Sequence, residues 1–556
     1  MNALLVIRIL ATFARAQEPS LSTGDWVGQF VKHDSSTFIH VRFASDGSIG
    51  RADLPQNNLW DVKVFDVRSA GDSLSFLLAL RGDTARFAGE ARRDGINGTL
   101  AIRGEQLPLE LIHRMAYDSS VVRPLAGNYR IARDRVISMG PMDEADGWLS
   151  FFDSKTRRGG ILYALSDSVF FTGATFGLDY PIAIRARVHR SASGKVSSLT
   201  WMENGSPPRD ATRIDDYVQE NIAFTNDAVR LVGNLTTPKG AGPHPAVILI
   251  HGCCGILPTR DFGYWSTYLA GKGIAVLAYD RRGGGESTGD PNTATYEDIA
   301  DDVLAGLALL ETRKDIDSRR IGFFGMSNGG YIAPLAAARS HGRVAFIAVR
   351  SGSAQRVGDN IAYEVANDLR SEGFSERDVA RAVTIRQRVT DFVIARPSIS
   401  VPAWDSLRAE VTAVSGEKWF PWARVMWVPR VSPVDSFGLA FLNSLRASWR
   451  YDPIPDWRLV RVPVYIMLGG LDRSVPTAES AKLFRATFAA AGVKNATVRV
   501  FPAGNHGLLE ARTGFQRETH ALGYYVAGFQ EDLVRWIQRV GRPVKKIADD
   551  KGVSDF

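Results

Sequence analysis

Cysteine is almost absent from this chain, and its scarcity excludes several kinds of site. Only two of the 556 residues are cysteines, the neighbours Cys253 and Cys254. Two cysteines cannot build a disulfide framework or a four-cysteine zinc site, although a strained disulfide between these neighbours stays open. No cluster of His, Asp and Glu has zinc-ligand spacing, no G-x-x-x-x-G-K-[ST] loop occurs, and Gly283–Gly285 lacks dinucleotide-binding spacing. We therefore expect neither a metal nor another cofactor.

Long hydrophobic runs are equally scarce. No segment approaches the roughly 18 consecutive apolar residues that a membrane-spanning helix needs, so we expect no transmembrane segment. Residues 1–17 contain a short apolar run followed by Ala14-Arg15-Ala16, a pattern typical of signal-peptide cleavage, and they predict a secreted or periplasmic protein. Arg8 interrupts the run and no basic residue precedes it, so a cytoplasmic protein with a loose amino-terminal segment is the alternative.

The chain has no strong excess of charge of either sign. Lys and Arg number 67 against 60 Asp and Glu, a net charge of +7, and the isoelectric point is about 9.3. The arginines are scattered along the chain, without the basic stripe that nucleic-acid binding requires, so we expect no nucleic-acid partner. The length predicts two to four globular domains.

The amino-terminal part of the chain, residues 20–205, consists of short strand-like runs separated by turn signals. Residues 37–43 and 74–80 are examples, and an Asp-Gly or Gly-Asp pair follows each of them. Short strands at this spacing are typical of antiparallel sheets. The sequence predicts two small β modules, 20–115 and 116–205, each a barrel or a sandwich.

The pattern changes after about residue 220. Continuous apolar runs of the kind found in buried parallel strands occur at residues 246–250, 274–278, 321–324 and 464–468. Amphipathic stretches of helical length, such as Tyr296–Thr312, lie between them. This alternation predicts an α/β domain with a mostly parallel sheet over residues 220–540, followed by a polar tail at 541–556.

An insert at about residues 354–455 interrupts this alternation. Six of the 12 tryptophans fall in its second half or just beyond it: Trp404, Trp419, Trp422, Trp427, Trp449 and Trp457. These side chains either form the insert's own core or line a cap over a ligand pocket. We expect the insert to form a helical cap.

The strongest chemical motif is Gly325-Met-Ser327-Asn-Gly329, which lies between an apolar strand and a helix-like stretch. A serine at such a sharp strand-to-helix turn has its hydroxyl exposed at the carboxyl edge of the sheet, and the turn requires small flanking residues. The following helix offers its amino-terminal N–H groups to a developing oxyanion. Ser327 is therefore the candidate nucleophile.

A serine hydroxyl needs a base and an oriented imidazole to act as a nucleophile. His506 is the best candidate for the base, because it lies in a loop that follows the expected strand at 496–500 and precedes the last helices. Asp472 follows the run at 464–468 and lies between the serine and the histidine in sequence, so it is the candidate orienting acid. Its rival Asp280 also follows an apolar run, and we expect it to be an ion-pair partner of the adjacent Arg281 or Arg282.

Backbone N–H groups are the expected oxyanion donors. The segment His251-Gly252-Cys253 follows the first buried strand, where this kind of site has such a loop. We expect the N–H of Cys253 to act together with the N–H of Asn328. The alternative of a cysteine nucleophile finds no support, because neither cysteine occupies a sharp strand-to-helix turn.

Together these residues resemble the serine α/β-hydrolase superfamily. The order Ser327, Asp472, His506 matches its pattern, as do the segments 251–252, 280–283 and 325–329. Residues 231–238 resemble the esterase and acyl-peptidase branch related to prolyl oligopeptidases and dienelactone hydrolases. The resemblance covers residues 220–540 and implies an α/β-hydrolase fold. The amino-terminal modules resemble, more faintly, β domains that precede such hydrolases in some bacterial proteins.

The resemblance implies a serine hydrolase that cleaves carboxylic esters through an acyl-enzyme, and the tryptophan-rich insert favours an apolar or aromatic acyl group. A serine peptidase on short peptides uses the same three side chains, but it needs a carboxylate or similar group to anchor a free amino terminus. A ligand-binding protein without catalysis is the third hypothesis. It is disfavoured because a silent relative has no need to keep the nucleophile, base, acid and oxyanion loop.

Overall fold

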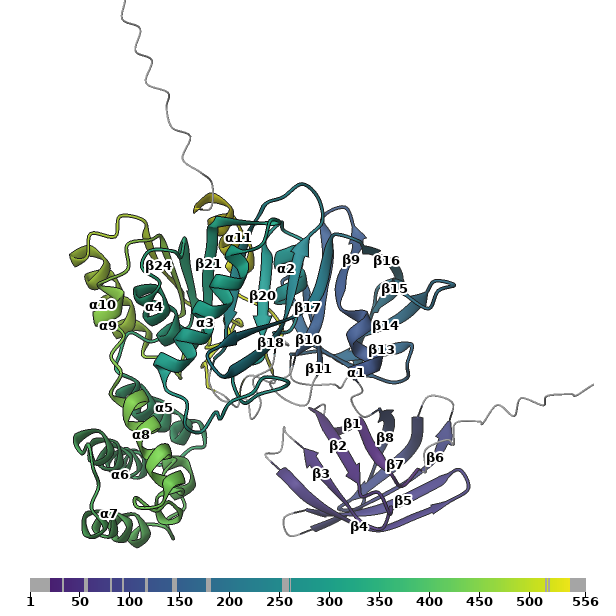
Figure 1. Ribbon diagram of the computed structural model, residues 1–556. Coiled ribbons are helices and arrows are strands. Elements are labelled where there is room, and N and C mark those ends of the chain that lie inside the picture. The colour runs from purple at the N-terminus through teal and green to yellow at the C-terminus, as the bar shows by residue number, and fades with distance from the viewer. Residues whose placement is uncertain are drawn as a thin grey trace, which may run out of the picture. The chain divides into compact units, whose positions relative to one another are not determined.

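A computed structural model describes residues 21–540, apart from 33–34, 55–58, 81–82, 93–94, 116–118, 143–147, 177–181, 253–259, 261, 516–517 and 519–520 (Figure 1). The predicted signal peptide (1–17) and polar tail (541–556) lie outside these residues. The described chain divides into two compact units, one made of residues up to 116 with 164–167, the other of the remainder.

The first unit is a closed barrel of eight antiparallel strands, with β8 paired to β1. The strands are β1 (Gly24–Lys32), β2 (Ser35–Phe43), β3 (Gly50–Leu54), β4 (Leu59–Ala70), β5 (Ser73–Leu80), β6 (Asp83–Arg92), β7 (Gly95–Ile102) and β8 (Glu105–Arg114). Side chains along β5 and β6 alternate between the buried interior and solvent, as strands with one buried face do. Phe76 and Phe87 stack inside the barrel with ring centroids 4.9 Å apart.

The second unit begins with another closed barrel of eight antiparallel strands. It follows a short α1 (Ser119–Val122) and a 3-10 turn η2 (Arg123–Leu125), and it comprises β9 (Gly127–Ala132), β10 (Arg135–Met142), β11 (Trp148–Asp153), β12 (Gly159–Ala164), β13 (Val169–Gly173), β14 (Ile182–Arg190), β15 (Val196–Glu203) and β16 (Arg209–Ile214). Pairing of β16 with β9 closes it. The prediction of two antiparallel β modules is confirmed, and both are barrels rather than sandwiches.

The rest of the second unit is built on an eight-stranded sheet with the order β17-β18-β20-β19-β21-β22-β23-β24. Its strands are β17 (Tyr217–Asn226), β18 (Val229–Pro238), β19 (His244–Ile250), β20 (Ala275–Tyr279), β21 (Ile316–Met326), β22 (Phe346–Arg350), β23 (Val464–Gly469) and β24 (Ala496–Phe501). β17 is antiparallel to β18, and β18 is antiparallel to β20. The strands from β20 to β24 in this spatial order, β19 included, run parallel to one another. This is the predicted α/β-hydrolase sheet.

Helices cover both faces of this sheet, which is why central strands such as β19, β20 and β23 are buried along almost their whole length. One face packs against α3 (Tyr296–Glu311), α4 (Gly329–Arg339) and α10 (Thr477–Ala490), and the other against α2 (Trp265–Ala270) and α11 (Phe529–Val540). Thr295 and Asp298 form a reciprocal capping box that starts α3 where its amphipathic pattern begins. Among the described residues no helix is both long and apolar enough to span a membrane.

The predicted insert is a helical cap, and its helices gather beyond one end of the sheet (Figure 1). It contains α5 (Val357–Ser371), α6 (Glu376–Ala395), α7 (Val401–Ala413), η3 (Phe420–Ala423), η4 (Val428–Arg430) and α8 (Ser436–Arg450), and a short α9 (Ile454–Trp457) returns the chain to the sheet. Four of the six tryptophans are buried in the core: Trp404, Trp419, Trp449 and Trp457. Trp422 is 37% exposed and Trp427 is half-buried. Most of the tryptophans therefore form the core of this region.

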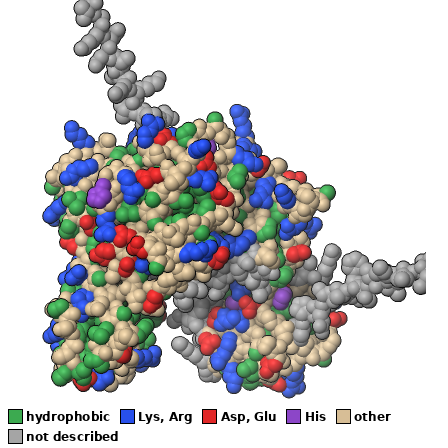
Figure 2. All heavy atoms as spheres, viewed as in Figure 1, with side chains coloured by type: hydrophobic (Ala, Val, Ile, Leu, Met, Phe, Trp, Pro, Cys, Tyr) green, Lys and Arg blue, Asp and Glu red, His purple; other side chains and the backbone are tan. Residues whose placement is uncertain are grey.

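Lys and Arg side chains are interspersed with Asp and Glu on the face shown in Figure 2. Many of the arginines make ion pairs, for example Arg339 with Asp301 and Arg343 with Glu311. This distribution agrees with the scatter of arginines along the sequence.

Candidate functional site

Ser327 lies at the sharp turn between β21 and α4. Its φ of 53° is in the left-handed region, which costs a non-glycine residue energy and is typical of strained functional turns. A hydrogen bond from its N–H to the carbonyl of Arg350 (2.8 Å) fixes the turn to β22. A Cβ on Gly329 would lie 2.5 Å from the carbonyl oxygen of Ile250, and one on Gly325 would overlap the Gly329 carbonyl. The turn therefore requires glycine at both positions.

His506 and Asp472 lie beside this serine. The Nε2 atom of His506 is 2.9 Å from Ser327 Oγ, and its Nδ1 atom is 2.8 Å from Asp472 Oδ2. Asp472 follows β23 and His506 follows β24, so neighbouring parallel strands deliver both side chains to the carboxyl edge where β21 delivers Ser327. The structure thus brings the three candidate residues into one hydrogen-bonded series.

The acid is held firmly in this series. Asp472 is 2% exposed, and its Oδ1 accepts hydrogen bonds from the N–H groups of Ser474 (2.8 Å) and Val475 (2.9 Å). Hydrogen bonds from these backbone donors fix the orientation of the carboxylate. Oδ2 is then left to accept from the His506 Nδ1–H, which assigns the lone pair on Nε2 to the serine.

The electrostatic balance at His506 raises the pKa of its imidazole. Burial alone lowers the pKa of the imidazole, but the charge of Asp472 and its hydrogen bond outweigh burial and raise the pKa above 6.5. Arg350 acts in the lowering direction and Glu364 in the raising direction, both more weakly. A base with a raised pKa stabilises the proton that it takes from a serine hydroxyl.

The candidate oxyanion donors are only partly within the described residues. Asn328 precedes the first turn of α4, and its side-chain Nδ2 donates to Tyr296 Oη (2.7 Å), which fixes the residue at the helix start. Gly252 lies next to the serine, since a Cβ there would be 3.4 Å from Ser327 Cβ. Cys253 and Cys254 lie outside the described residues, so the second donor stays a prediction.

His251 of the expected oxyanion loop and Asp280, the rival of Asp472, both have structural contacts. His251 is hydrogen-bonded through Nε2 to the carbonyl of Tyr279 (2.8 Å), and burial lowers its pKa to about 4, so it stays neutral. Asp280 accepts from the N–H groups of Arg260 (2.6 Å) and Glu286 (2.8 Å).

The predicted ion pair of Asp280 with Arg281 or Arg282 is wrong. Arg282 forms a buried two-bond pair with Asp302 of α3 instead, and Arg260 lies 3.6 Å from Asp280. The loop that follows β20 turns back through Gly285, whose close approach to the carboxylate brings the Glu286 N–H onto Asp280. Asp280 therefore organises this loop.

The first cap helix, α5, supports the acid loop, and the sequence offered no clear signal for this role. Tyr363 Oη donates to the carbonyl of Asp472 (3.3 Å), and the Nδ2 groups of Asn360 and Asn367 donate to the carbonyls of Ser474 and Arg473 (3.1 Å each). The only hint is that the two asparagines and the tyrosine recur at helical spacing, which puts them on one face.

One turn along the same face, Glu364 brings a second carboxylate near His506. Burial raises the pKa of Glu364, while Arg424 acts in the opposite direction. Arg424 donates to Glu364 (2.7 Å) and to Asp368 (2.7 Å), so one guanidinium bridges both carboxylates. The single positive charge of Arg424 therefore offsets part of the negative charge of these two carboxylates.

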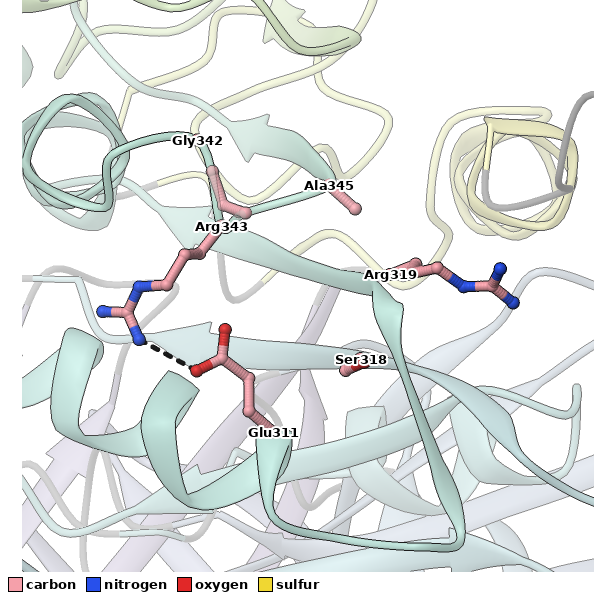
Figure 3. Close-up of a pocket in the computed structure, with 7 residues that line it drawn as sticks. Glu311, Ser318, Arg319, Gly342, Arg343 and Ala345 are labelled. Atoms are coloured by element: carbon pink, nitrogen blue, oxygen red, sulfur yellow. Dashed lines mark hydrogen bonds and ion pairs between the residues drawn. The ribbon is translucent and has the colours of Figure 1, made fainter.

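A surface hollow of about 470 Å³ lies elsewhere on the sheet (Figure 3). Ser318 and Arg319 of β21, and residues 342–345 before β22, line it, and Arg343 pairs with Glu311 at its margin. These residues are at the amino-terminal ends of the strands, whereas ligands of open parallel sheets bind at the carboxyl ends. The hollow is therefore separate from the Ser327 site. Within the described residues no group of three or more His, Cys, Asp and Glu is arranged to hold a metal.

Sequence comparison with known proteins agrees with the fold. Residues 247–515 match a sequence family described as the alpha/beta hydrolase family. Esterase EstD of Thermotoga maritima is 34% identical over 166 residues, which are 28% of this chain and 39% of that esterase. A non-heme haloperoxidase of Rhodococcus erythropolis is 26% identical over 254 residues, covering 45% of this chain and 82% of that protein. The chain thus spans about two fifths of the length of the curated esterase.

An esterase from Pyrococcus furiosus aligns with 58% of this chain and 90% of its own chain, at 16% sequence identity and a TM-score of 0.35.

Proposed function

We propose, since the carboxy-terminal domain belongs to the α/β-hydrolase superfamily, that this chain is a serine hydrolase that cleaves carboxylic esters through an acyl-enzyme. The observation that carries the proposal is the pair of contacts at His506, 2.9 Å to Ser327 Oγ and 2.8 Å to Asp472 Oδ2. These are hydrogen-bond distances suited to proton transfer, and they need no rearrangement of the loops.

In the proposed mechanism Ser327 Oγ attacks the acyl carbon of the ester while His506 Nε2 takes the hydroxyl proton. The N–H groups of Asn328 and Cys253 stabilise the oxyanion of the tetrahedral intermediate. When the intermediate collapses, the imidazolium gives its proton to the leaving alkoxide, and the acyl group stays on the serine. Water activated by the same imidazole then releases the acid and restores the serine.

The proposal extends to an apolar or aromatic acyl group. Its support is the cap, whose α5 contacts the acid loop through Tyr363. Because Trp404, Trp419 and Trp449 are buried in the interior of the cap, they stabilise the cap and do not contact a substrate directly. The half-buried Trp427 is the better candidate for direct contact.

A serine peptidase on short peptides is the second candidate, because α5 brings carboxylates near His506. A free peptide amino terminus would require a carboxylate to pair with its ammonium group. Glu364 and Asp368 are the nearest candidates on α5, but Arg424 already pairs with both of them. An ammonium would have to displace that guanidinium, which favours the neutral ester substrate.

The test offers purified protein an acyl p-nitrophenyl ester and an aminoacyl p-nitroanilide. Turnover of the ester alone supports the esterase, comparable turnover of the anilide supports the peptidase, and turnover of neither supports a ligand-binding protein. Ser327→Ala should lower ester turnover by roughly 10^4- to 10^6-fold with an unchanged circular dichroism spectrum. An active, folded Ser327→Ala protein would remove the proposed mechanism.

We also propose that the protein is exported, on the evidence of residues 1–17 alone. Expression with and without residues 1–17, followed by cell fractionation, tests this. Retention of the full-length protein in the cytoplasm would contradict the proposal, and export without residues 1–17 would show that this segment is not the signal.

A further inference from the structure

The His506 loop is supported from outside by the second barrel, through an intermediate segment at residues 522–526. On one side this segment binds the loop: the Glu510 N–H donates to the carbonyl of Tyr524 (2.8 Å), and the Val526 N–H donates to that of Leu508 (2.9 Å). The loop itself is a compact turn, because Asn505 Oδ1 accepts from the N–H groups of Gly507 and Leu509, at 2.9 Å each.

On its other side the same segment binds the turn between β11 and β12. The Tyr525 N–H donates to the carbonyl of Arg157 (2.9 Å), and the Gly159 N–H donates to that of Gly523 (3.0 Å). A Cβ on Gly159 would lie 2.5 Å from the Tyr525 ring, so glycine is required for this approach. The backbone of the barrel turn and the backbone of the His506 loop are therefore joined through one short segment.

Arg157 links the two sides directly. Its Nη1 donates to Glu510 Oε1 (2.6 Å), four residues after His506, and to the carbonyl of Tyr525 (2.7 Å). The residue has a φ of 65°, a left-handed conformation that is costly for arginine and that aims the side chain at the loop. A conformation of this kind persists where the surrounding contacts hold it.

The barrel turn is rigid enough to act as a support. Asp153 is 2% exposed, and its Oδ1 accepts from the N–H of Lys155 (3.0 Å), while its Oδ2 pairs with Arg135 inside the barrel. Next to it Phe152 is fully buried, stacks on Tyr264 at 5.1 Å and meets the Tyr525 ring edge-on at 5.7 Å. In Figure 1 the barrel lies beside α2, the helix that follows Tyr264.

We infer that the β11–β12 turn of the second barrel is a positioning element for His506 and that Arg157 is its main positioning residue. It acts through Glu510 and Tyr525 on the loop that presents Nε2 to Ser327. An error of about 1 Å in the alignment of reacting groups can cost roughly 100-fold in rate, so loss of this support lowers turnover without removing a reacting group. This inference rests on the proposed function.

The test compares Arg157→Ala with Lys155→Ala. Lys155 is a matched control, because it lies in the same turn but pairs with Asp134 of the barrel (2.7 Å). For Arg157→Ala we expect kcat to fall about 10- to 100-fold with KM within about twofold, and backbone amides of 505–510 and 522–526 to exchange hydrogen faster. Lys155→Ala should match the parent protein in all three measurements, and Arg157→Lys should restore part of kcat.

Glu510→Gln provides a second variant in case Arg157→Ala does not fold. It keeps an acceptor but removes the charge, so kcat should fall in the same direction by a smaller factor. Parent-like kcat for both Arg157→Ala and Glu510→Gln overturns the inference. A fall in kcat without faster exchange, or an equal fall in Lys155→Ala, also overturns it.

Failure of the proposed function gives a different pattern. If the parent protein hydrolyses neither ester nor anilide, the esterase proposal is lost, but the exchange experiment still tests the support. In that event parent-like exchange in Arg157→Ala rejects the contact, and faster exchange confined to 505–510 and 522–526 supports it.

Discussion

The two barrels share a strand number and closure but differ in what covers their outer faces. In the first barrel, β5 and β6 alternate between buried and exposed side chains, and Phe76 and Phe87 point inward. In the second barrel, β12 is buried along almost its whole length. The inward Phe151 packs against Trp201, while the adjacent Phe152 packs outward against Tyr264. One architecture thus forms a compact unit of its own in one place and a wall of the unit that contains Ser327 in the other.

The covering of the barrels predicts where a change in a barrel should affect turnover. A barrel whose outer face is exposed packs only on its own interior. A barrel whose outer face is also buried is close-packed against a neighbouring element, and it helps to fix the position of that element. We therefore expect mutations in the second barrel to alter both stability and turnover, and mutations in the first barrel to alter stability alone.

The largest fall in kcat should come from replacing Asp472, the direct hydrogen-bond partner of His506. Any fall in kcat caused by a change in a barrel should be smaller than this one. Asp472→Asn removes the carboxylate that fixes the imidazole tautomer, so kcat should fall by about 10^4-fold while the melting temperature changes little. Ester turnover and a thermal melt measure both. If Asp472→Asn kept kcat within tenfold of the parent while Asp280→Asn abolished it in folded protein, our assignment of the acid would be wrong.

A sharper contrast between the barrels comes from removing one aromatic ring from each. Phe152→Ala and Phe76→Ala both empty a buried site, and each should cost about 3–5 kcal/mol in the free energy of unfolding of its own unit. Calorimetry distinguishes the two units by which transition moves. Phe152→Ala should also lower kcat, whereas Phe76→Ala should not.

The control for this pair is ester turnover measured well below both melting temperatures, where each variant is folded. Equal losses of kcat in Phe76→Ala and Phe152→Ala would contradict the claim that only the second barrel affects turnover, because the first barrel would then also act on the site.

The cap also acts on His506, through the charge of Glu364. A pH profile of kcat/KM separates this effect on the pKa of His506 from the effect of the second barrel on the position of its loop. Because the pKa of His506 is raised, kcat/KM should fall as pH decreases through a value above 6.5. Glu364 contributes in the raising direction, so Glu364→Gln should move this acidic limb to lower pH, by less than Asp472→Asn does. Asp359→Asn is the matched control on α5, since Asp359 pairs with Arg356. If the acidic limb of the kcat/KM profile did not move in Glu364→Gln, Glu364 would not be a contributor to the raised pKa of His506.

The sheet and the three central residues could be predicted because their signals are local. Apolar runs at 321–324 and 464–468 identify the buried strands that Ser327 and Asp472 follow, and the strand-like stretch at 496–500 identifies the strand before His506. Parallel strands bring such positions to one edge whatever the length of chain between them. The expected partner of Asp280 was wrong for a complementary reason: nearness in sequence suggested Arg281 or Arg282, but Arg282 pairs with Asp302, and Asp280 accepts from the Arg260 N–H.

The support of the His506 loop could not be predicted in this way. Arg157 lies in a polar turn that resembles any solvent-exposed hairpin, and its partner Glu510 is more than 350 residues away. Phe152 follows Phe151 in a strand, and the sequence does not say that both faces are covered. Contacts between separately patterned domains leave no periodic signal in either one, so only the three-dimensional structure reveals them.

The smallest effect concerns histidines with opposite pKa shifts in the two units. Burial lowers the pKa of His113 in the first barrel, although Asp25 acts in the opposite direction, and the ring meets Trp26 edge-on at 5.0 Å. The unfolded chain therefore binds a proton more readily than the barrel does, and the barrel loses stability as pH falls below about 6.5. His506 has the opposite sign: its stabilising contribution is present below pH 6.5 and is lost as pH rises through its raised pKa.

His113→Gln should consequently flatten the pH dependence of the first barrel's unfolding between pH 5 and 8 and leave that of the catalytic unit unchanged. Asp25 does not interfere in this range, because its pKa is lowered to about 2 and it stays ionised. Denaturant unfolding at several pH values, followed by a probe in each unit, measures the two slopes. An identical slope in the parent and in His113→Gln would show that the barrel does not hold this imidazole in its neutral form, and a changed slope in the catalytic unit would show that the two units do not unfold independently.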